Sequence, residues 1–305
     1  MSDTTELIRE ASTPRQPQRP DKVRSLWSDA FHDLRKRPIV IISAVIILFM
    51  ILIAAFPGLF SAQDPEDCRL ERFFGAPSAS AWFGYDQFGC DYWAMTVYGA
   101  RPSIVVGLVT ITFMVVLGGV LGALAGYYGG FTDTIVSRVI DIFNAIPFVL
   151  GAILILAIWR SAGDTVWPTI LALTVFGWPG IARMLRASFI EARGLDYVHA
   201  ARSLGAGDGR LMFRHIFPNA MAPMMSGVPL AIGGLIEAEA TLSFLGLGLK
   251  PPAVSWGSMI SNNVDTFISG HMLLLIAPAS FLLATTISFA LLGDAIRDAL
   301  DPKLR

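Results

Sequence analysis

Six long stretches of apolar residues alternate with polar segments along the chain. A membrane-spanning helix needs roughly 20 predominantly apolar residues, because its backbone polar groups must bond to one another inside the bilayer. Each stretch is long enough, or nearly so, to form such a helix. The pattern therefore predicts an all-α, polytopic membrane protein with six transmembrane helices, at about residues 39–56, 102–126, 136–158, 165–182, 220–245 and 272–293.

The polar segments divide the chain further. The leader splits into a Pro-, Gln- and Arg-rich part and a part with apolar residues at helical spacing beside Arg35, Lys36 and Arg37. That second part predicts a helix in the membrane interface, with packing on other protein as the alternative. The segments are a cytoplasmic leader (1–38), a first transmembrane helix (39–59), an extracytoplasmic loop (60–101), a transmembrane core (102–293) with a cytoplasmic loop at 191–219, and a cytoplasmic tail (294–305).

The fourth apolar stretch is the least regular. Gly177, Pro179 and Gly180 interrupt it, and Arg183 and Arg186 follow closely. We expect this helix to continue past the membrane on its charged side.

Composition supports a membrane protein. Hydrophobic residues make up 54% of the chain and charged residues only 15%, with a mean hydropathy of +0.58. Soluble domains carry about 25% charged residues. A soluble core cannot absorb this imbalance, so membrane lipid is the expected surrounding. The formal net charge of -1 argues neither for nucleic acid nor for an acidic substrate.

The distribution of Lys and Arg predicts the orientation, because positive residues near short loops stay in the cytoplasm. The leader, the loop before the third helix, residues 183–214 and the tail hold 18 of the 23 basic residues, and the opposite side holds five. Both termini and the 191–219 loop are therefore expected in the cytoplasm.

The two cysteines, Cys68 and Cys90, both fall in the first outward loop. This placement favours a structural disulfide in an oxidising compartment. Two free thiols are the alternative. A metal pair is disfavoured because the loop contains no His and two ligands leave a zinc site incomplete, so no metal site is expected.

Residues 197–219 are too polar to span the membrane and too regular for a linker. Ala200, Ala201 and Leu204 predict a short helix with a small-residue face, and the glycines that follow allow a sharp turn. Asp208 is expected to cap a second helix whose apolar side includes Leu211, Met212, Phe213 and Ile216,. Such a helix pair suits docking of a cytoplasmic partner, with an ordinary re-entrant or interfacial loop as the alternative.

The same segment resembles the Glu-Ala-Ala loop of binding-protein-dependent ABC importer permeases. Ala201 to Gly205 and Ile216-Phe-Pro218 fit that pattern, whereas His199 stands where the pattern has Glu. A solvated loop histidine is the alternative for this position. The resemblance implies contact with an ATPase through His199, Ala200, Ala201, Arg202, Leu204, Gly205, Asp208, Ile216 and Pro218.

Fragments elsewhere extend this resemblance over nearly the whole chain and narrow it to the C-type permeases of dipeptide, oligopeptide and nickel importers. Cys90 departs from the family, which commonly has Arg there. The fragments are residues 82–91, 98–101, Gly126-Tyr-Tyr-Gly-Gly130, 239–248, Pro251-Pro252, Ser255-Trp-Gly257 and 298–305.

The resemblance implies a type I ABC importer permease fold and a bacterial inner-membrane location. It also implies a B-type permease partner, two ATPase subunits and an external substrate-binding protein. The chain has no Gly-x-x-x-x-Gly-Lys-Ser/Thr motif, so ATP and Mg²⁺ are expected on the partner subunits. Peptides are the expected substrate, with nickel or another small solute as the alternative.

Two further classes of function are disfavoured. A membrane enzyme would need clustered His, Asp or Cys, but the four histidines are scattered along the chain, so no catalytic residue is expected. A secondary transporter would show internal repeats and interrupted helices in corresponding halves, and only one helix is interrupted here.

Three acidic residues lie within the apolar stretches, where charge is costly. Asp141 follows Arg138 by three residues, which suits a local ion pair on a helix. Glu237 and Glu239 are two residues apart, so they cannot both face one pathway. For Glu239 we expect a structural pair at a subunit interface, with a gate or a peptide-amine contact as the alternative.

The charge distribution gives a direct test of orientation. A protease-cleavable tag placed after Arg305 should be cut only by protease on the cytoplasmic side, as followed by immunoblotting of intact and inverted vesicles. Cutting from outside intact cells would reverse the orientation and place residues 191–219 away from any cytoplasmic ATPase.

Overall fold

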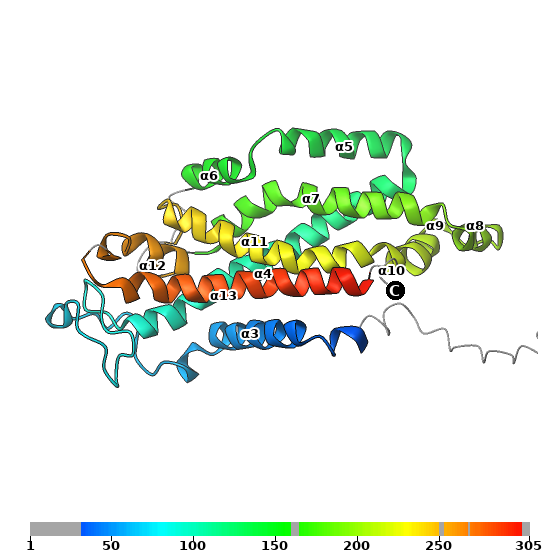
Figure 1. The fold of residues 1–305 in the computed structure, drawn as a ribbon. Coiled ribbons are helices and arrows are strands. Elements are labelled where there is room, and N and C mark those ends of the chain that lie inside the picture. Colours follow the sequence, from blue (N-terminus) through cyan, green and yellow to red (C-terminus); the bar gives the residue numbers. More distant parts are fainter. Residues whose placement is uncertain (1–31, 160–164, 250–252, 268, 301–305) are drawn as a thin grey trace, which may run out of the picture.

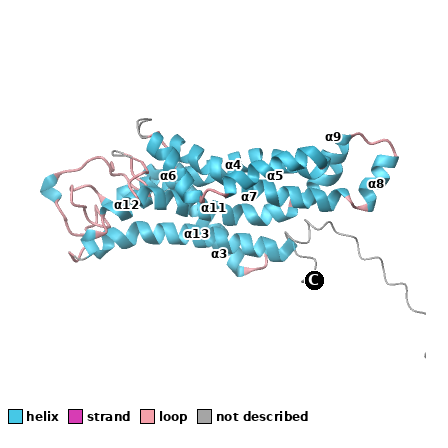
Figure 2. Cartoon of the chain, turned by 90° about the horizontal axis from the view of Figure 1, so that it is seen from above, coloured by secondary structure: helices cyan, strands magenta, loops and turns pink. Residues whose placement is uncertain are grey.

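The computed structural model describes residues 32–159, 165–249, 253–267 and 269–300. Its helices run side by side along one long axis (Figures 1 and 2). The long helices are α3 (Pro38–Ala55), α4 (Tyr92–Tyr128), α5 (Gly130–Asn144), α6 (Phe148–Ile158), α7 (Trp167–Arg193), α11 (Ala222–Phe244) and α13 (Met272–Leu300). Short elements lie at the two ends of the bundle: η1 (Pro57–Leu59), η2 (Leu70–Arg72), α12 (Trp256–Asn262) and η4 (Asp265–Phe267) at one, and α8 (Asp196–Ser203), α9 (Asp208–Arg210), η3 (Leu211–Ile216) and α10 (Phe217–Ala220) at the other.

Four helices, α3, α4, α7 and α13, are individually long and apolar enough to cross a membrane. Two pairs of helices, each bent at a short break, also meet these criteria when each pair is counted as one span. They are α5 with α6, and the helices of 208–220 with α11. Within the described residues the count therefore reaches the six predicted spans.

The third predicted helix is not continuous. It breaks into α5 and α6, which meet at 79°. Pro147 stands at the break, immediately before α6. Proline lacks a backbone N–H and disfavours helical geometry in the residue before it, so a single helix over 136–158 was wrong.

Two other helices are longer than the apolar pattern indicated. α7 continues to Arg193 on its charged side, as expected, with Pro179 accommodated inside it. α4 begins at Tyr92 rather than near residue 102, because the Asp91 carboxylate accepts a hydrogen bond from the Ala94 N–H and caps the helix there. The outward loop accordingly ends earlier than predicted. The expected leader helix over 21–37 falls almost wholly outside the described residues.

Helices α4 and α7 pack closely against each other. Gly118, Gly122 and Gly126 recur every fourth residue along α4 and so lie on one face of it. A Cβ added at any of the three would lie less than 3.0 Å from a backbone oxygen of α7, contributed by Trp178, Ala182 or Arg186 respectively. Glycine at these positions therefore allows the two backbones to approach, as small residues do in membrane helix pairs.

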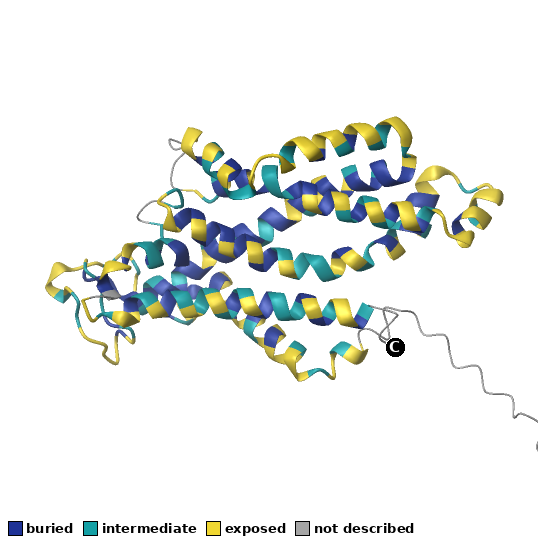
Figure 3. Ribbon diagram, turned by 45° about the horizontal axis from the view of Figure 1, so that its top comes forward, coloured by how far each residue is buried: buried dark blue, intermediate teal, exposed yellow. Residues whose placement is uncertain are grey.

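The buried residues form two clusters. The larger cluster lies among α4, α7, η3 and α11. The smaller one joins α3, the first turns of α4, α12 and α13 around the fully buried Trp256 and Tyr92. Exposed apolar side chains occupy the outer faces of α3, α5 and α6 (Figure 3), as expected of surfaces covered by lipid or another subunit.

The start of α3, the end of α13 and the 196–220 elements share one end of the bundle (Figures 1 and 2). Arg37, just before α3, forms an ion pair with Asp298 near the end of α13, at 3.3 Å. The loop of residues 60–91 and α12 occupy the opposite end. The structure therefore groups the segments that the charge pattern assigns to one side of the membrane.

Replacing Gly122 with alanine should destabilise the α4–α7 interface, because its methyl group would overlap the Ala182 carbonyl. Overpacking of this kind costs about 1–3 kcal/mol. A lower apparent melting temperature of the detergent-purified protein is the expected result. Gly119→Ala on the same helix is the matched control, since its Cβ would meet Leu185 Cδ2 at an ordinary 3.7 Å; equal melting temperatures for the two variants would contradict this packing.

Candidate functional site

Residues 196–220, which we call the coupling segment, fold as a short helix, a glycine turn and a second helical stretch. α8 ends at Ser203, and Gly205, two residues beyond it, has a φ of 86°, a left-handed conformation that favours glycine. The Gly205 N–H donates to the Arg202 carbonyl at 2.9 Å, and the Ala206 N–H donates to the Ala201 carbonyl at 3.1 Å. These two bonds form a Schellman cap, so the sharp turn expected after the first helix is present.

One face of the coupling segment is buried in the bundle. Val198, Leu211 and Ile216 are almost completely enclosed and belong to the larger core cluster. Residues 211–216 form a π-helical turn, in which backbone bonds skip one more residue than in an α-helix. The wider turn alters which side chains share a face, and Phe213, expected on the apolar side with Leu211, is instead 73% exposed.

The opposite face is open to solvent. Leu204 is 89% exposed, His199, Ala200 and Arg202 are exposed, and Ala201 is half-buried. Pro218 lies in the first turn of α10 and is exposed. Two large apolar side chains of the segment, Leu204 and Phe213, are thus exposed, and Phe213 borders an apolar hollow with Val115 and Val116 of α4.

Tyr127, at the end of α4, anchors the coupling segment. Its hydroxyl donates to Asp208 Oδ1 at 2.6 Å and accepts from Arg202 Nη2 at 3.3 Å, so one side chain joins both helices of the segment. Arg193 Nη1 donates to the Tyr127 carbonyl at 3.0 Å. The predicted helix-capping role of Asp208 was wrong: Gly207 is the N-cap residue, and the Asp208 carboxylate bonds to Tyr127 instead.

A second set of hydrogen bonds closes the base of the segment. The Tyr197 hydroxyl donates to the His215 carbonyl at 3.2 Å, and Asn219 Nδ2 donates to the Tyr197 hydroxyl at 2.8 Å.

An ion pair joins two of the long helices. Arg186 of α7 forms a bidentate ion pair with Asp133 of α5, with Nη2 to Oδ2 at 2.7 Å. Sequence reasoning named Arg202 and Asp208 as contact residues but did not predict any of these bonds, whose partners outside the 197–219 segment are Tyr127, Asp133, Arg186 and Arg193.

A polar hollow lies beside the coupling segment. His199, the residue that departs from the expected pattern, shares its wall with Arg193 and Arg202. The remaining wall comes from Tyr127, Tyr128, Gly194 and Asp208.

Glu237 and Glu239 differ in burial, as expected for residues two positions apart on a helix. Glu237 is exposed, whereas Glu239 is 1% exposed and accepts hydrogen bonds from Ser243 Oγ at 2.7 Å and Ser103 Oγ at 2.9 Å. Glu239 therefore bonds within its own subunit, and neither the expected interface pair nor a pathway contact fits this burial. Asp141 pairs with Arg138 at 3.5 Å on the surface of α5, as predicted.

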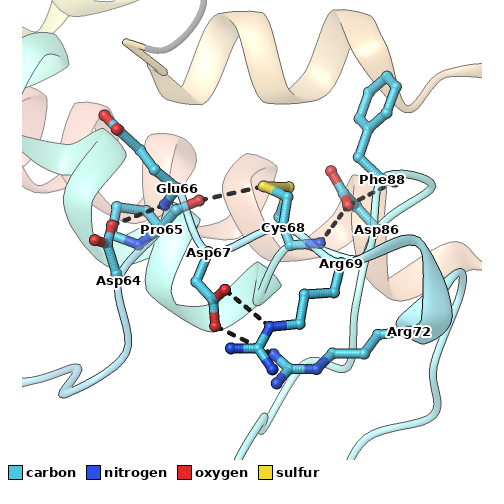
Figure 4. Close-up of a disulfide and its surroundings, with 10 residues drawn as sticks. Asp64, Pro65, Glu66, Asp67, Cys68, Arg69, Arg72, Asp86 and Phe88 are labelled. Atoms are coloured by element: carbon cyan, nitrogen blue, oxygen red, sulfur yellow. Dashed lines mark hydrogen bonds and ion pairs between the residues drawn. A yellow bond between two sulfur atoms is a disulfide. The ribbon is translucent and has the colours of Figure 1, made fainter.

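At the other end of the bundle, Cys68 and Cys90 form a disulfide, which confirms the pairing expected from the sequence (Figure 4). Beside it, Asp67 accepts from Arg69 at 3.1 Å and pairs with Arg72 at 3.7 Å. The Arg69 N–H also donates to the Gly89 carbonyl at 3.2 Å. The disulfide and these bonds hold the two halves of the loop together next to the start of α4.

The fold of the chain is similar to that of known membrane transporters. The membrane helices superpose on the inward-facing MetNI methionine ABC transporter with a TM-score of 0.55 and 20% identity, covering 68% of this chain and 96% of the other. At that identity the match concerns the fold alone. The fold is that of the type I ABC importer permeases.

Sequence comparison narrows the class to a family. Residues 118–305 match the model of the binding-protein-dependent transport system inner membrane component. Residues 25–77 match the N-terminal transmembrane domain of oligopeptide transport permease C. The chain belongs to the family of binding-protein-dependent transport system inner membrane components.

Three relatives illustrate the branch. The chain is 37% identical to the oligopeptide transport system permease protein OppC of Bacillus subtilis (strain 168), over 93% of this chain and 92% of the relative. It is 35% identical to the dipeptide transport system permease protein DppC of the same organism, over 98% and 91%. It is 34% identical to the glutathione transport system permease protein GsiD of Pectobacterium atrosepticum, over 94% of each chain. The resemblance to C-type peptide permeases is confirmed.

The hydroxyl of Tyr127 should govern how firmly the coupling segment is held. Tyr127→Phe keeps the buried ring but removes both bonds to Asp208 and Arg202, so amide hydrogen exchange across residues 196–208 should accelerate severalfold. Tyr128→Phe is the matched control, because Tyr128 is 55% exposed. Equal exchange in the two variants would show that the hydroxyl does not anchor the segment.

Proposed function

We propose that this chain is a permease subunit of an ATP-driven importer for short peptides. It pairs with a B-type permease, receives peptide from an external substrate-binding protein and is driven by two ATPase subunits that bind ATP and Mg²⁺. Its membrane is the bacterial cytoplasmic membrane, with both termini and the coupling segment in the cytoplasm. The chain contributes a pathway and a mechanical link, and no covalent chemistry.

The observation that carries this proposal is the family membership together with the peptide substrates named for its relatives. The matched relatives are permeases for oligopeptides, dipeptides and glutathione, which is itself a tripeptide. They match over more than nine-tenths of this chain, so the likeness includes the outward loop as well as the helices.

The coupling segment supports the ATPase contact. It is anchored through Tyr127 and the core, and its Leu204 and Phe213 side chains are exposed. A partner that covers these side chains can move the segment as a unit. Because the segment bonds directly to the end of α4, such movement reaches the membrane helices and can shift the balance between inward- and outward-facing states.

Replacing Gly205 with valine should uncouple ATP hydrolysis from transport. A β-branched residue at a φ of 86° is strained by about 1–3 kcal/mol, so the Schellman turn should rearrange. Peptide uptake by the reconstituted complex should fall at least about tenfold, and stimulation of ATPase activity by loaded binding protein should be lost.

Gly207→Val is the control for that experiment. Its φ of −71° is accessible to every residue, and a Cβ there meets nothing within 4 Å. Normal uptake and stimulated ATPase activity in a well-expressed Gly205→Val complex would contradict the coupling role.

A further inference from the structure

The polar hollow beside the coupling segment has a volume of about 500 Å³ and gathers nitrogen donors from two helices. Arg193 comes from the last turn of α7 and Arg202 from the last turn of α8. His199, three residues before Arg202 on α8, lines the same hollow. Even a neutral imidazole carries one N–H donor, so all three side chains can donate hydrogen bonds to a group bound there.

Tyr127 holds both guanidinium groups in place. Arg193 Nη1 donates to its carbonyl at 3.0 Å, and Arg202 Nη2 donates to its hydroxyl at 3.3 Å. Each guanidinium group has five N–H donors, yet within the described ranges neither arginine makes a further hydrogen bond or ion pair. Most of these donors are therefore free, although the groups that carry them are fixed.

The nearby acids leave the hollow positively charged. Asp208, the one acid that lines it among the described residues, accepts from the Tyr127 hydroxyl and forms no ion pair with either arginine. Asp133 of α5 is bound by Arg186 in a bidentate pair. Positive residues are expected in cytoplasmic segments, but that rule does not require arginines of two separate helices to share one hollow, where their charges repel. An anion bound between them would offset this repulsion.

We propose that the hollow receives the carboxylate of an aspartate or glutamate of the ATPase subunit, an assignment that rests on the proposed function. The planar donor groups of Arg193 and Arg202 match the two oxygens of a carboxylate, and the His199 ring supplies a further donor. Two arginines and one aspartate leave an excess of one positive charge, which a single carboxylate balances. The polarity of the contact is thereby specified: the permease contributes the cations and the ATPase contributes the acid.

A protein carboxylate fits this place better than a lipid phosphate. α8 lies farther along the bundle than the start of α3 and the end of α13 (Figures 1 and 2), so it extends beyond those ends of the membrane helices. Leu204, two residues after Arg202, is 89% exposed. An apolar surface of a folded partner can cover this side chain, whereas a lipid headgroup cannot. The docking surface therefore combines an apolar contact at Leu204 with the cations beside it.

The contact can be tested by introducing a single amine. Residues 37–249 contain no lysine, so Arg202→Lys keeps the positive charge and supplies an amine that the wild-type segment lacks. The purified complex with its ATPase subunits, in lipid nanodiscs, is treated with a water-soluble carbodiimide, which joins an amine to a carboxylate in contact with it. Cross-linked peptides are identified by mass spectrometry. Arg210→Lys is the matched control, because Arg210 is an exposed arginine of the same segment that does not line the hollow.

Arg202→Lys should give a cross-link between position 202 and an aspartate or glutamate of the ATPase. This product should be absent from the wild type and from Arg210→Lys. Cross-linking of position 202 to Asp208 alone would show that the chain neutralises the hollow by itself, and the proposal would be wrong. Equal yields of ATPase cross-links from the two variants would overturn it as well, because the hollow would then have no preference for the acid.

Binding strength gives a second test. The dissociation constant of the ATPase from the permeases should rise about tenfold in Arg202→Gln at low salt, since a hydrogen bond to a charged group contributes roughly that factor. It should remain unchanged in Arg210→Gln. The effect of Arg202→Gln should shrink at high salt, which screens exposed charges. A rise that persists unchanged at high salt would indicate a structural defect and would contradict the charge contact.

The two levels of the proposal fail in different ways. If the wild-type permeases bind no ATPase at all, the proposed function fails and this contact fails with it. If they bind the ATPase but Arg202→Lys forms no cross-link to it, the proposed function stands and the carboxylate contact is wrong.

Discussion

The structure depends on how closely the backbones of α4 and α7 approach. Gly118, Gly122 and Gly126 leave room for the carbonyl groups of α7, and no side chain separates the two helices along that line. Inside a membrane, hydrophobic burial does little to join helices, so close packing of small residues must do so. Once these two helices are fixed, α11 packs beside them and the larger core cluster forms.

The same contact determines the position of the coupling segment. It brings the end of α4 beside the end of α7, so that Arg193 reaches the Tyr127 carbonyl and the Tyr127 hydroxyl faces Asp208. The bidentate pair between Arg186 and Asp133 adds α5 to this group. The segment that presents Leu204 and Phe213 is therefore held by the membrane helices rather than by its own short helices, which are too short to be stable alone.

Hydropathy and charge were sufficient to predict the helical class and the grouping of the described segments at each end, and the placement of the two cysteines predicted their disulfide. The six predicted spans are reached when each bent helix pair counts as one. Predictions based on neighbouring residues in the sequence were less reliable where a residue far away in the sequence bonded to the same side chain. Asp208 had the residue type and position of a helix cap, but the Tyr127 hydroxyl, 81 residues away in sequence, took its carboxylate. The π-helical turn that exposes Phe213 likewise leaves no mark in the apolar pattern. Glu239 was expected to form a structural pair at a subunit interface because charge in a membrane helix is costly, yet two serines of the same subunit donate to its carboxylate.

The length of α4 has a mechanical consequence. At 1.5 Å per residue, its 37 residues extend about 55 Å, against about 30 Å for the hydrocarbon layer. One end is tied by Asp91 to the loop that the disulfide closes, and the other ends in the tyrosine beneath the coupling segment. The helix thus joins the two surfaces as one continuous element, with Pro102 inside it. A movement at one membrane surface can therefore reach the other through α4 alone. Tilting the helix by a few degrees at one surface displaces its far end by several ångströms, without rearrangement of other elements in between.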